Sequence, residues 1–244
     1  MNRMLNYPGD AQDPVRADLV LAREDDVPLV VFFASGELLP QIRQACSRQR
    51  VPHFHLLLVN VNDSNALLSC WPARNGETFF AGHGDITRQF LETRLLPWAL
   101  DHLPAKPDQI WLGGYSLGGL FALWAGLQSP QFQRLLCVSG SVWFEHFEEW
   151  AMKQPVGGQL KSVYFSLGTK EVKTGNPLLQ KTGEIMETLC SHFQSRGIDS
   201  TLVWNPGTHF TEVPGRIARA IGWTFSVDAE PGSEGSGTQP PLKS

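Results

Sequence analysis

Ser116 lies at the centre of the sequence Gly114-Tyr115-Ser116-Leu117-Gly118, which has the pattern Gly-x-Ser-x-Gly. This pattern is typical of a nucleophile elbow, a sharp turn between a strand and a helix that exposes a serine hydroxyl. The glycines are needed because strand and helix approach each other closely there and leave little room for a Cβ. A glycine-rich turn around a structural serine would have the same five letters, so the flanking sequence must decide.

The flanking sequence favours the elbow. A short apolar run at 109–112 is typical of a buried strand. The segment 117–128 is rich in Leu, Ala and Phe and predicts a helix, which Ser129-Pro130 should end. Strand, turn and helix is the context that the motif requires, so we interpret Ser116 as a nucleophile.

A serine hydroxyl becomes a strong nucleophile when a base removes its proton, so Ser116 requires a histidine. His209 is the best candidate among seven, because it follows the predicted strand 201–204 in a loop. Ligands of open α/β sheets bind outside the carboxyl ends of the strands. His83, which lies between two glycines, is the other loop histidine worth testing. We expect His53 and His55 to be polar residues of a strand, and His102 and His192 to lie on helix surfaces. His146 lies in an aromatic segment and could contact the substrate.

An acid should follow the strand that precedes the histidine strand. Glu171 lies there, directly after the apolar run 163–167. The order serine, acid, histidine along the chain is that of α/β-hydrolases. In this role Glu171 would hold the imidazole tautomer and stabilise the imidazolium. A solvated surface glutamate beside Lys170 remains the alternative.

The oxyanion of an acyl-transfer reaction needs two fixed N–H donors. One is expected from Leu117, and the other from the loop after the strand 29–33. Gly36 permits a tight backbone in that loop, so the amide of Glu37 is the first choice. Ser35 fits an ordinary turn residue equally well.

Aromatic residues follow the carboxyl ends of two predicted strands, where they can form a mostly apolar pocket with a few polar groups. Our candidates for the substrate pocket are Trp71, Trp143, Phe144 and Tyr115. Burial against the sheet is the alternative, and it fits Phe147 and Trp150 at least as well.

The surrounding pattern predicts an α/β fold. Strands are expected at 15–22 (an edge strand), 29–33, 54–61, 109–112, 135–138, 163–167 and 201–204. Helices are expected at 38–48, 86–103, 117–128, 177–195 and 214–225, and a long loop at 60–84. Asp85 should cap the second helix and Pro97 should kink it. This alternation implies a mostly parallel central sheet with helices on both faces.

Composition restricts the function classes. The chain has 244 residues, of which 42% are hydrophobic, and its net charge is −4 without a basic run. A single domain over 1–227 is expected, followed by a disordered tail over 228–244 that is rich in Gly, Ser, Pro and Glu. The charge argues against nucleic acid, and no 18-residue apolar stretch predicts a membrane span. Four widely spaced cysteines and no apolar leader predict a cytoplasmic protein.

Four segments resemble the putative-esterase branch of α/β-hydrolases, which includes the esterase D type and siderophore esterases related to enterobactin hydrolases. They are Gly113–Leu120 (GGYSLGGL), Val138–Trp143 (VSGSVW), Leu167–Glu171 (LGTKE) and Asn205–Phe210 (NPGTHF), and the likeness extends over about 29–223. The resemblance implies an α/β-hydrolase fold and a serine hydrolase of carboxylic esters that needs no cofactor or metal. It assigns nucleophile, base and acid to Ser116, His209 and Glu171.

Three points limit what the resemblance implies. The N-terminal half is short, so we expect the leading strands typical of the family to be missing or abbreviated. The loop 34–37 reads Ala-Ser-Gly-Glu where relatives usually carry Asp-Gly. Some siderophore esterases of this family work with a Ser–His pair alone, which leaves the role of Glu171 open. We therefore expect an acyl-enzyme reaction on a small-molecule ester, with the oligomeric state open. An acyltransferase or thioesterase with the same triad is the nearest alternative, and a non-catalytic binding protein of the same fold is a weaker one.

Overall fold

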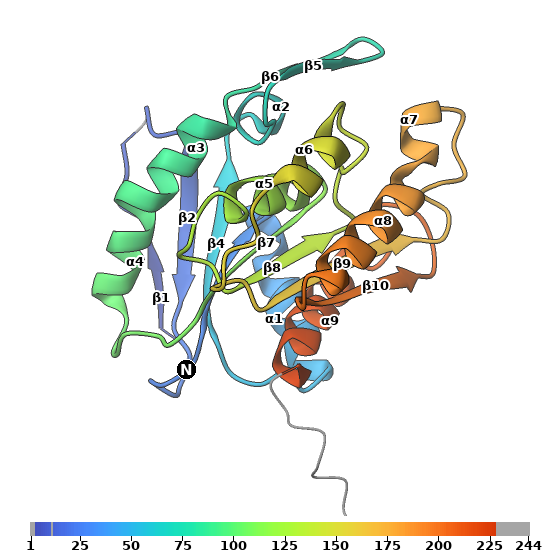
Figure 1. Cartoon of the computed structure of the whole chain (residues 1–244). Helices are drawn as coiled ribbons and strands as arrows, with labels where there is room; N and C mark the ends of the chain where they lie inside the picture. Colours follow the sequence, from blue (N-terminus) through green and yellow to red (C-terminus); the bar gives the residue numbers. More distant parts are fainter. Residues whose placement is uncertain (1–2, 11, 228–244) are drawn as a thin grey trace, which may run out of the picture.

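The computed structural model of the chain describes residues 3–10 and 12–227 (Figure 1). Its centre is an eight-stranded sheet with the order β1-β2-β4-β3-β7-β8-β9-β10. The strands are β1 (Met4–Asn6), β2 (Val15–Val20), β3 (Leu29–Phe33), β4 (His55–Val61), β7 (Ile110–Tyr115), β8 (Arg134–Val138), β9 (Ser162–Gly168) and β10 (Asp199–Asn205). All pairs from β4 to β10 are parallel, and only the pairs that involve β2 are antiparallel. The predicted mostly parallel sheet is confirmed.

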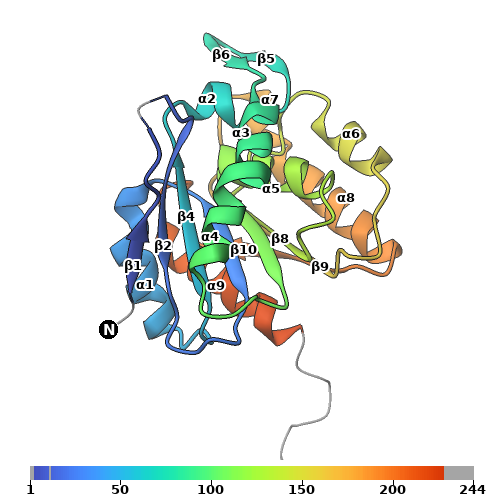
Figure 2. The ribbon, with the colours of Figure 1, turned by 90° about the vertical axis from the view of Figure 1, so that its left-hand side faces the viewer.

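Helices cover both faces of this sheet (Figures 1 and 2). They are α1 (Leu39–Arg48), α2 (Ser64–Leu67), α3 (Gly84–Phe90), α4 (Leu96–His102), α5 (Leu117–Gly126), α6 (Phe147–Lys153), α7 (Pro177–Gln180), α8 (Thr182–Ser195) and α9 (Val213–Ser226). One core joins α1 and α9 to one face, through Ile42 and Ile217, and the other joins α5 and α8 to the opposite face. Among the described residues, no helix combines the length and apolar character needed to cross a bilayer.

The amino-terminal side of the sheet differs from the prediction. The strand predicted at 15–22 forms as β2, but it is not at the edge, because β1 pairs with it antiparallel, with Met4 opposite Val20. Only three residues form β1, and two of them are exposed. Such a short strand has no hydrophobic alternation that could reveal it in the sequence. The predicted tail at 228–244 lies outside the described residues.

The segment 60–84 is ordered into regular elements, so the prediction of a long loop is wrong. It contains α2, whose N-cap Asp63 accepts a hydrogen bond from the Ala66 amide at 3.1 Å. It also contains a hairpin of β5 (Pro72–Asn75) and β6 (Thr78–Ala81), in which Gly76 has a φ of +58°. The hairpin and α2 lie above the end of the sheet at which β4 finishes (Figure 1).

The helix predicted at 86–103 is interrupted. It begins at Gly84, with His83 at the N-cap, so Asp85 lies in the first turn and is not the cap. A π-helical segment at Leu91–Leu95 separates α3 from α4. Pro97, the second residue of α4, has no N–H to donate to the carbonyl of Thr93, which explains why the regular α-helical bonding fails here.

The contact between β7 and α5 is unusually close. A Cβ on Gly114 would lie 2.2 Å from the carbonyl carbon and oxygen of Gly118. A Cβ on Gly118 would in turn lie 2.6 Å from the carbonyl oxygen of Phe33, in the neighbouring strand β3. Both obstacles are backbone atoms, which cannot move out of the way as a flexible side chain could. The two glycines of the motif are therefore required by the packing of β3, β7 and α5.

The replacement Gly114→Ala should destabilise the fold, because the added methyl overlaps backbone in a filled core. Overpacking of this kind typically costs about 1–3 kcal/mol or more in the free energy of unfolding. Gly157→Ala is a matched control, since a Cβ there meets nothing within 4 Å. Urea unfolding of both variants measures the difference. Equal unfolding midpoints would show that the two elements are not packed as closely as described.

Candidate active site

Ser116 lies between the end of β7 and the start of α5, with φ 59° and ψ −121°. This backbone conformation is costly for a residue with a side chain, and it persists only where the surroundings enforce it. The amide of Ser116 donates to the carbonyl of Val138 at 3.1 Å. Its carbonyl accepts from the amides of Gly119 and Ser141, each at 3.0 Å. With a further bond from the Leu120 amide at 3.2 Å, four backbone hydrogen bonds hold the strained turn that presents the hydroxyl.

The structure brings Ser116, His209 and Glu171 into one hydrogen-bonded chain. The Ser116 Oγ lies 3.1 Å from the Nε2 of His209. The Nδ1 of the same ring lies 2.7 Å from the Oε2 of Glu171. If Nδ1–H donates to the carboxylate, Nε2 carries a lone pair and accepts from the serine hydroxyl. The residues follow β7, β10 and β9, so the parallel sheet gathers them at its carboxyl end.

The loop that carries His209 is held by its own backbone and by Tyr115. Gly207 has a φ of +97°, and a Cβ there would lie 2.5 Å from the Oγ1 of Thr211. The same hydroxyl accepts from the amide of Thr208 at 2.9 Å. The hydroxyl of Tyr115 donates to the carbonyl of His209. These contacts fix the histidine relative to the end of β7, where Ser116 lies.

Glu171 is a buried carboxylate whose side chain is 9% exposed. Its Oε1 accepts from the Gly168 amide at 2.7 Å, the Ser139 hydroxyl at 3.0 Å and the Nη1 of Arg216 at 2.7 Å. Burial by itself would raise the pKa of Glu171. The hydrogen bond and charge of His209, with the Gly168 amide and Arg216, outweigh burial and hold that pKa below its usual value. Glu171 is thus an anion at neutral pH.

Sequence reasoning missed Ser139 and Arg216, which both bind Glu171. The side chain of Arg216 is only 1% exposed. It lies on the buried side of α9, together with apolar residues such as Ile217 and Ile221. A basic residue on the apolar stripe of a helix, directly after the histidine loop, was the available signal. Ser139 lies in the segment Val138–Trp143, which carries part of the family resemblance, but nothing in that segment predicts its contact with Glu171, 32 positions further along the chain.

A cavity of about 240 Å³ adjoins the serine. Its lining consists of Phe33, Ala34, Ser35, Val59, Asn60, Val61, Ser64, Leu68, Tyr115, Ser116, Leu117 and Gly118. The expected oxyanion donor Leu117 lies in this lining, whereas Gly36 and Glu37 lie outside it, in a 3₁₀ turn. The Ala34 amide already donates to the carbonyl of Val59 at 3.0 Å. The amide of Ser35 is therefore better placed as a second donor than that of Glu37.

Of the aromatic residues expected in the pocket, Tyr115 alone lines this cavity. The other three form a separate aromatic cluster around Phe80. Phe144 is buried with its ring 5.3 Å from that of Phe80, and the Trp143 ring lies 6.0 Å from it. The Trp71 ring packs on Phe144 at 5.8 Å, and its Nε1 donates to the Glu145 carbonyl at 3.0 Å. Phe80, Trp143 and Phe144 also line a smaller cavity of about 160 Å³, whose lining does not include Ser116.

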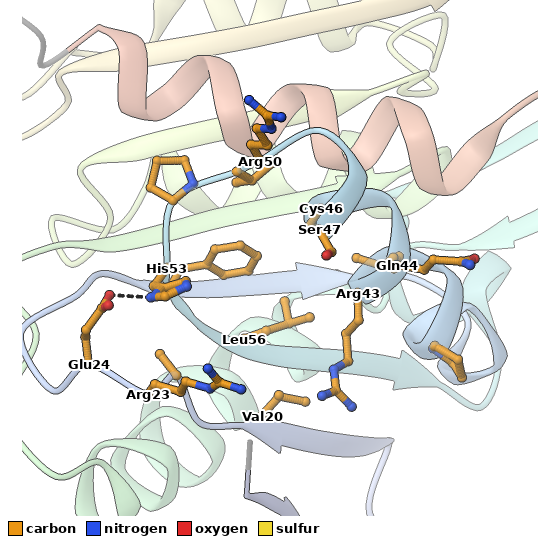
Figure 3. Close-up of a pocket in the computed structure, with 16 residues that line it drawn as sticks. Val20, Arg23, Glu24, Arg43, Gln44, Cys46, Ser47, Arg50, His53 and Leu56 are labelled. Atoms are coloured by element: carbon orange, nitrogen blue, oxygen red, sulfur yellow. Dashed lines mark hydrogen bonds and ion pairs between the residues drawn. The ribbon is translucent and has the colours of Figure 1, made fainter. Parts of the chain in front are cut away.

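A larger hollow than the one beside Ser116 lies elsewhere (Figure 3). It has about 950 Å³ and lies between α1 and the strands β2 and β4, with residues such as Arg43 and Leu56 in its lining. One end carries the pair of His53 and Glu24, 2.5 Å apart. Neither Ser116 nor His209 lines it, so size does not identify the candidate site. Within residues 3–10 and 12–227, no group of three His, Cys, Asp or Glu side chains could hold a metal.

Comparisons with known proteins show the family to which the chain belongs. A family model described as "Putative esterase" matches residues 38–209. The uncharacterized protein YbbA of Bacillus subtilis is 29% identical over 179 residues, which cover 65% of this chain and 70% of that protein.

Two solved structures share the fold. The siderophore hydrolase EstA from Aspergillus nidulans has a TM-score of 0.74 at 14% identity, covering 94% of this chain and 95% of its own. The enterobactin esterase FES from Shigella flexneri has a TM-score of 0.68 at 18% identity, covering 92% of this chain and 59% of its own. The fold is that of the α/β-hydrolases. The chain belongs to this esterase family, and it is a carboxylic ester hydrolase.

The folded state should favour the anion of Glu171, because its pKa is lowered from the ordinary value of 4.5. Its contribution to stability is present above that value and is lost as the pH falls through the lower folded value. We expect the difference in unfolding free energy between wild type and Glu171→Gln to shrink as the pH falls below 4.5.

Urea unfolding across this pH range measures that difference. Glu187→Gln, at an exposed glutamate of α8, is the matched control and should give a small, nearly constant difference. A Glu171→Gln difference that does not change with pH would contradict the description of the carboxylate as a stabilised anion.

Proposed function

We propose that the chain hydrolyses carboxylic esters through an acyl-enzyme, with Ser116 as nucleophile, His209 as base and Glu171 as the orienting acid. The observation that carries this proposal is the continuous pair of contacts, 3.1 Å from Ser116 to His209 and 2.7 Å from His209 to Glu171. A triad is defined by such geometry together with the roles of its members. The lowered pKa of Glu171 supports its role as the anion of the set.

In the first half of the reaction, the Ser116 oxygen attacks the ester carbonyl while Nε2 of His209 takes the hydroxyl proton. Glu171 stabilises the resulting imidazolium and keeps its own charge. The tetrahedral intermediate then collapses, the C–O bond to the alcohol breaks, and His209 gives its proton to the leaving oxygen. In the second half, water repeats the attack on the acyl-serine, and the carboxylic acid leaves.

The oxyanion of each tetrahedral intermediate needs preorganised donors. We assign these to the amides of Leu117 and Ser35, in place of our expectation of Glu37 or Gly36. Leu117 is the first residue of α5, so its N–H is also at the positive end of that helix. Ser35 is supported by its place in the lining of the cavity that adjoins Ser116.

The same cavity suits an acyl group of modest size. Its volume is about 240 Å³. A short acyl chain or a single aromatic ring fits such a volume. Phe33, Val59 and Leu68 supply apolar wall, while Asn60 and Ser64 can bind a polar substituent. The substrate is therefore a small-molecule ester, and the siderophore hydrolases among the structural neighbours make siderophore esters one class to test.

Replacement of the nucleophile should abolish ester hydrolysis. We expect Ser116→Ala to lower kcat by on the order of 10⁴-fold or more, with binding largely retained. The measurement is a panel of p-nitrophenyl esters of increasing acyl length, with siderophore and thioester substrates added. Activity should be highest for short acyl groups, since the cavity limits chain length.

A fluorophosphonate probe supplies an independent readout, because it labels activated serines. Ser141→Ala is the control, since that serine is buried near the turn and contacts Ser116 through its backbone amide alone. It should keep both labelling and hydrolysis. Hydrolysis and labelling that persist undiminished in Ser116→Ala would exclude the serine mechanism.

A further inference from the structure

Arg216 links the two segments that carry Glu171 and His209. Its Nη1 donates to the Oε1 of Glu171 at 2.7 Å and to the Ser139 hydroxyl at 2.9 Å. Its Nη2 donates to the carbonyls of Thr208 at 2.8 Å and Pro206 at 3.3 Å. Both carbonyls belong to the loop that ends in His209. One guanidinium therefore contacts the acid and the histidine loop at once.

We propose that Arg216 is a positioning residue, which fixes Glu171 against the His209 loop and sets, through its charge, the pH range in which His209 acts as a base. This inference rests on the proposed function. Arg216 acts through its neighbours and not on the substrate. It is almost fully buried, and it binds Oε1 of Glu171, whereas His209 binds Oε2.

The carboxylate of Glu171 is shared between two nitrogen donors, the imidazole of His209 and the guanidinium of Arg216. Its Oε2 faces His209 and its Oε1 faces Arg216, at 2.7 Å in each case. With both oxygens bound, the carboxylate cannot rotate away from the imidazole. A guanidinium stays protonated at every pH at which the protein is folded, and its planar fork suits this multiple contact better than an ammonium does. Arg216 thus provides a permanent charge and a fixed geometry.

The surrounding backbone leaves room for this arrangement. A Cβ on Gly168 would lie 2.7 Å from the Oε1 of Glu171 and 2.8 Å from the Nη2 of Arg216. Any side chain at this position would therefore push the ion pair apart. The Gly168 amide also donates to Glu171, so the same residue both makes space for the pair and binds it.

Other titratable groups near the pair keep one charge through the useful pH range. The Tyr115 hydroxyl donates to the histidine loop, and burial raises the pKa of this tyrosine. Burial raises the pKa of Tyr164, on β9, to about 12. Arg219, one turn further along α9, bonds to Asn205. Neither tyrosine therefore adds an anion beside the pair of Arg216 and Glu171 at neutral or mildly acidic pH.

The charges of Arg216 and Glu171 must affect the protonation of the His209 imidazole in opposite directions. Arg216 repels the imidazolium and neutralises part of the carboxylate that attracts it. Removing the guanidinium favours protonation of His209, which moves the acidic limb of kcat/KM to higher pH. Removing the charge of Glu171 disfavours protonation and moves that limb to lower pH. A residue with a purely structural role would move the limb in neither direction.

The experiment compares pH profiles of kcat/KM for wild type, Arg216→Met, Arg216→Lys and Glu171→Gln on an activated ester. We expect Arg216→Met to move the acidic limb upward by about one pH unit, at the low end of the effect of a neighbouring charge. Glu171→Gln should move it downward. Arg216→Lys should keep the limb close to wild type but lower kcat roughly 10- to 100-fold, because an ammonium cannot hold Glu171 and Thr208 together.

Arg219→Met is the matched control, since this arginine lies on the same helix and has no hydrogen bond or ion pair with Glu171. It should leave the limb in place. An unshifted limb in Arg216→Met, or a shift in the same direction as Glu171→Gln, would overturn the inference. If Arg216→Met does not fold, the Arg216→Lys variant decides. A wild-type kcat in Arg216→Lys overturns the inference. A reduced kcat in Arg216→Lys, with the acidic limb of its kcat/KM profile unshifted, supports the inference.

The two proposals fail in different ways. If Ser116→Ala keeps its activity, the serine mechanism is wrong. If Ser116→Ala is inactive while the Arg216 variants have wild-type pH profiles and kcat, only the role of Arg216 is wrong.

Discussion

The approach of β7 to α5 at Gly114 and Gly118 is the constraint on which the site depends. Backbone atoms there leave no space for a Cβ, so the chain turns sharply and holds Ser116 at a φ of 59°. The strain of that residue is offset by hydrogen bonds from its backbone to Val138, Gly119 and Ser141. Because β7 is a central strand with β3 and β8 as neighbours, the hydroxyl is presented from the middle of the sheet.

The remaining site residues depend on a second feature, a buried ionic cluster at the ends of β9 and β10. A carboxylate removed from water is costly unless its oxygens are hydrogen-bonded. Glu171 meets this requirement with His209, Arg216, Ser139 and the amide of Gly168. The cluster joins loops from two strands to α9, so the imidazole is positioned by packing that extends well beyond the serine.

Much of this architecture could be predicted from the sequence. The strand at 29–33 and the helix at 117–128 were predicted well because continuous apolar runs and turn residues are local signals. Short elements such as β1 and the β5–β6 hairpin have too few residues to show a period. A 3₁₀ turn begins at Gly36, which no propensity predicts, and this turn is why we propose Ser35 in place of Glu37 as the second oxyanion donor. Arg216 and Ser139 depend on contacts between distant segments, and a sequence alone does not reveal these.

The central claim is that Ser116, His209 and Glu171 act as one unit. The most direct test compares kcat of Ser116→Ala, of His209→Ala and of the variant in which all three residues are replaced by alanine, on one activated ester. Residues that act as a unit are strongly non-additive, so the triple variant should be about as slow as Ser116→Ala or His209→Ala alone. Losses that multiply, so that the triple variant is slower by the product of the single effects, would contradict the claim.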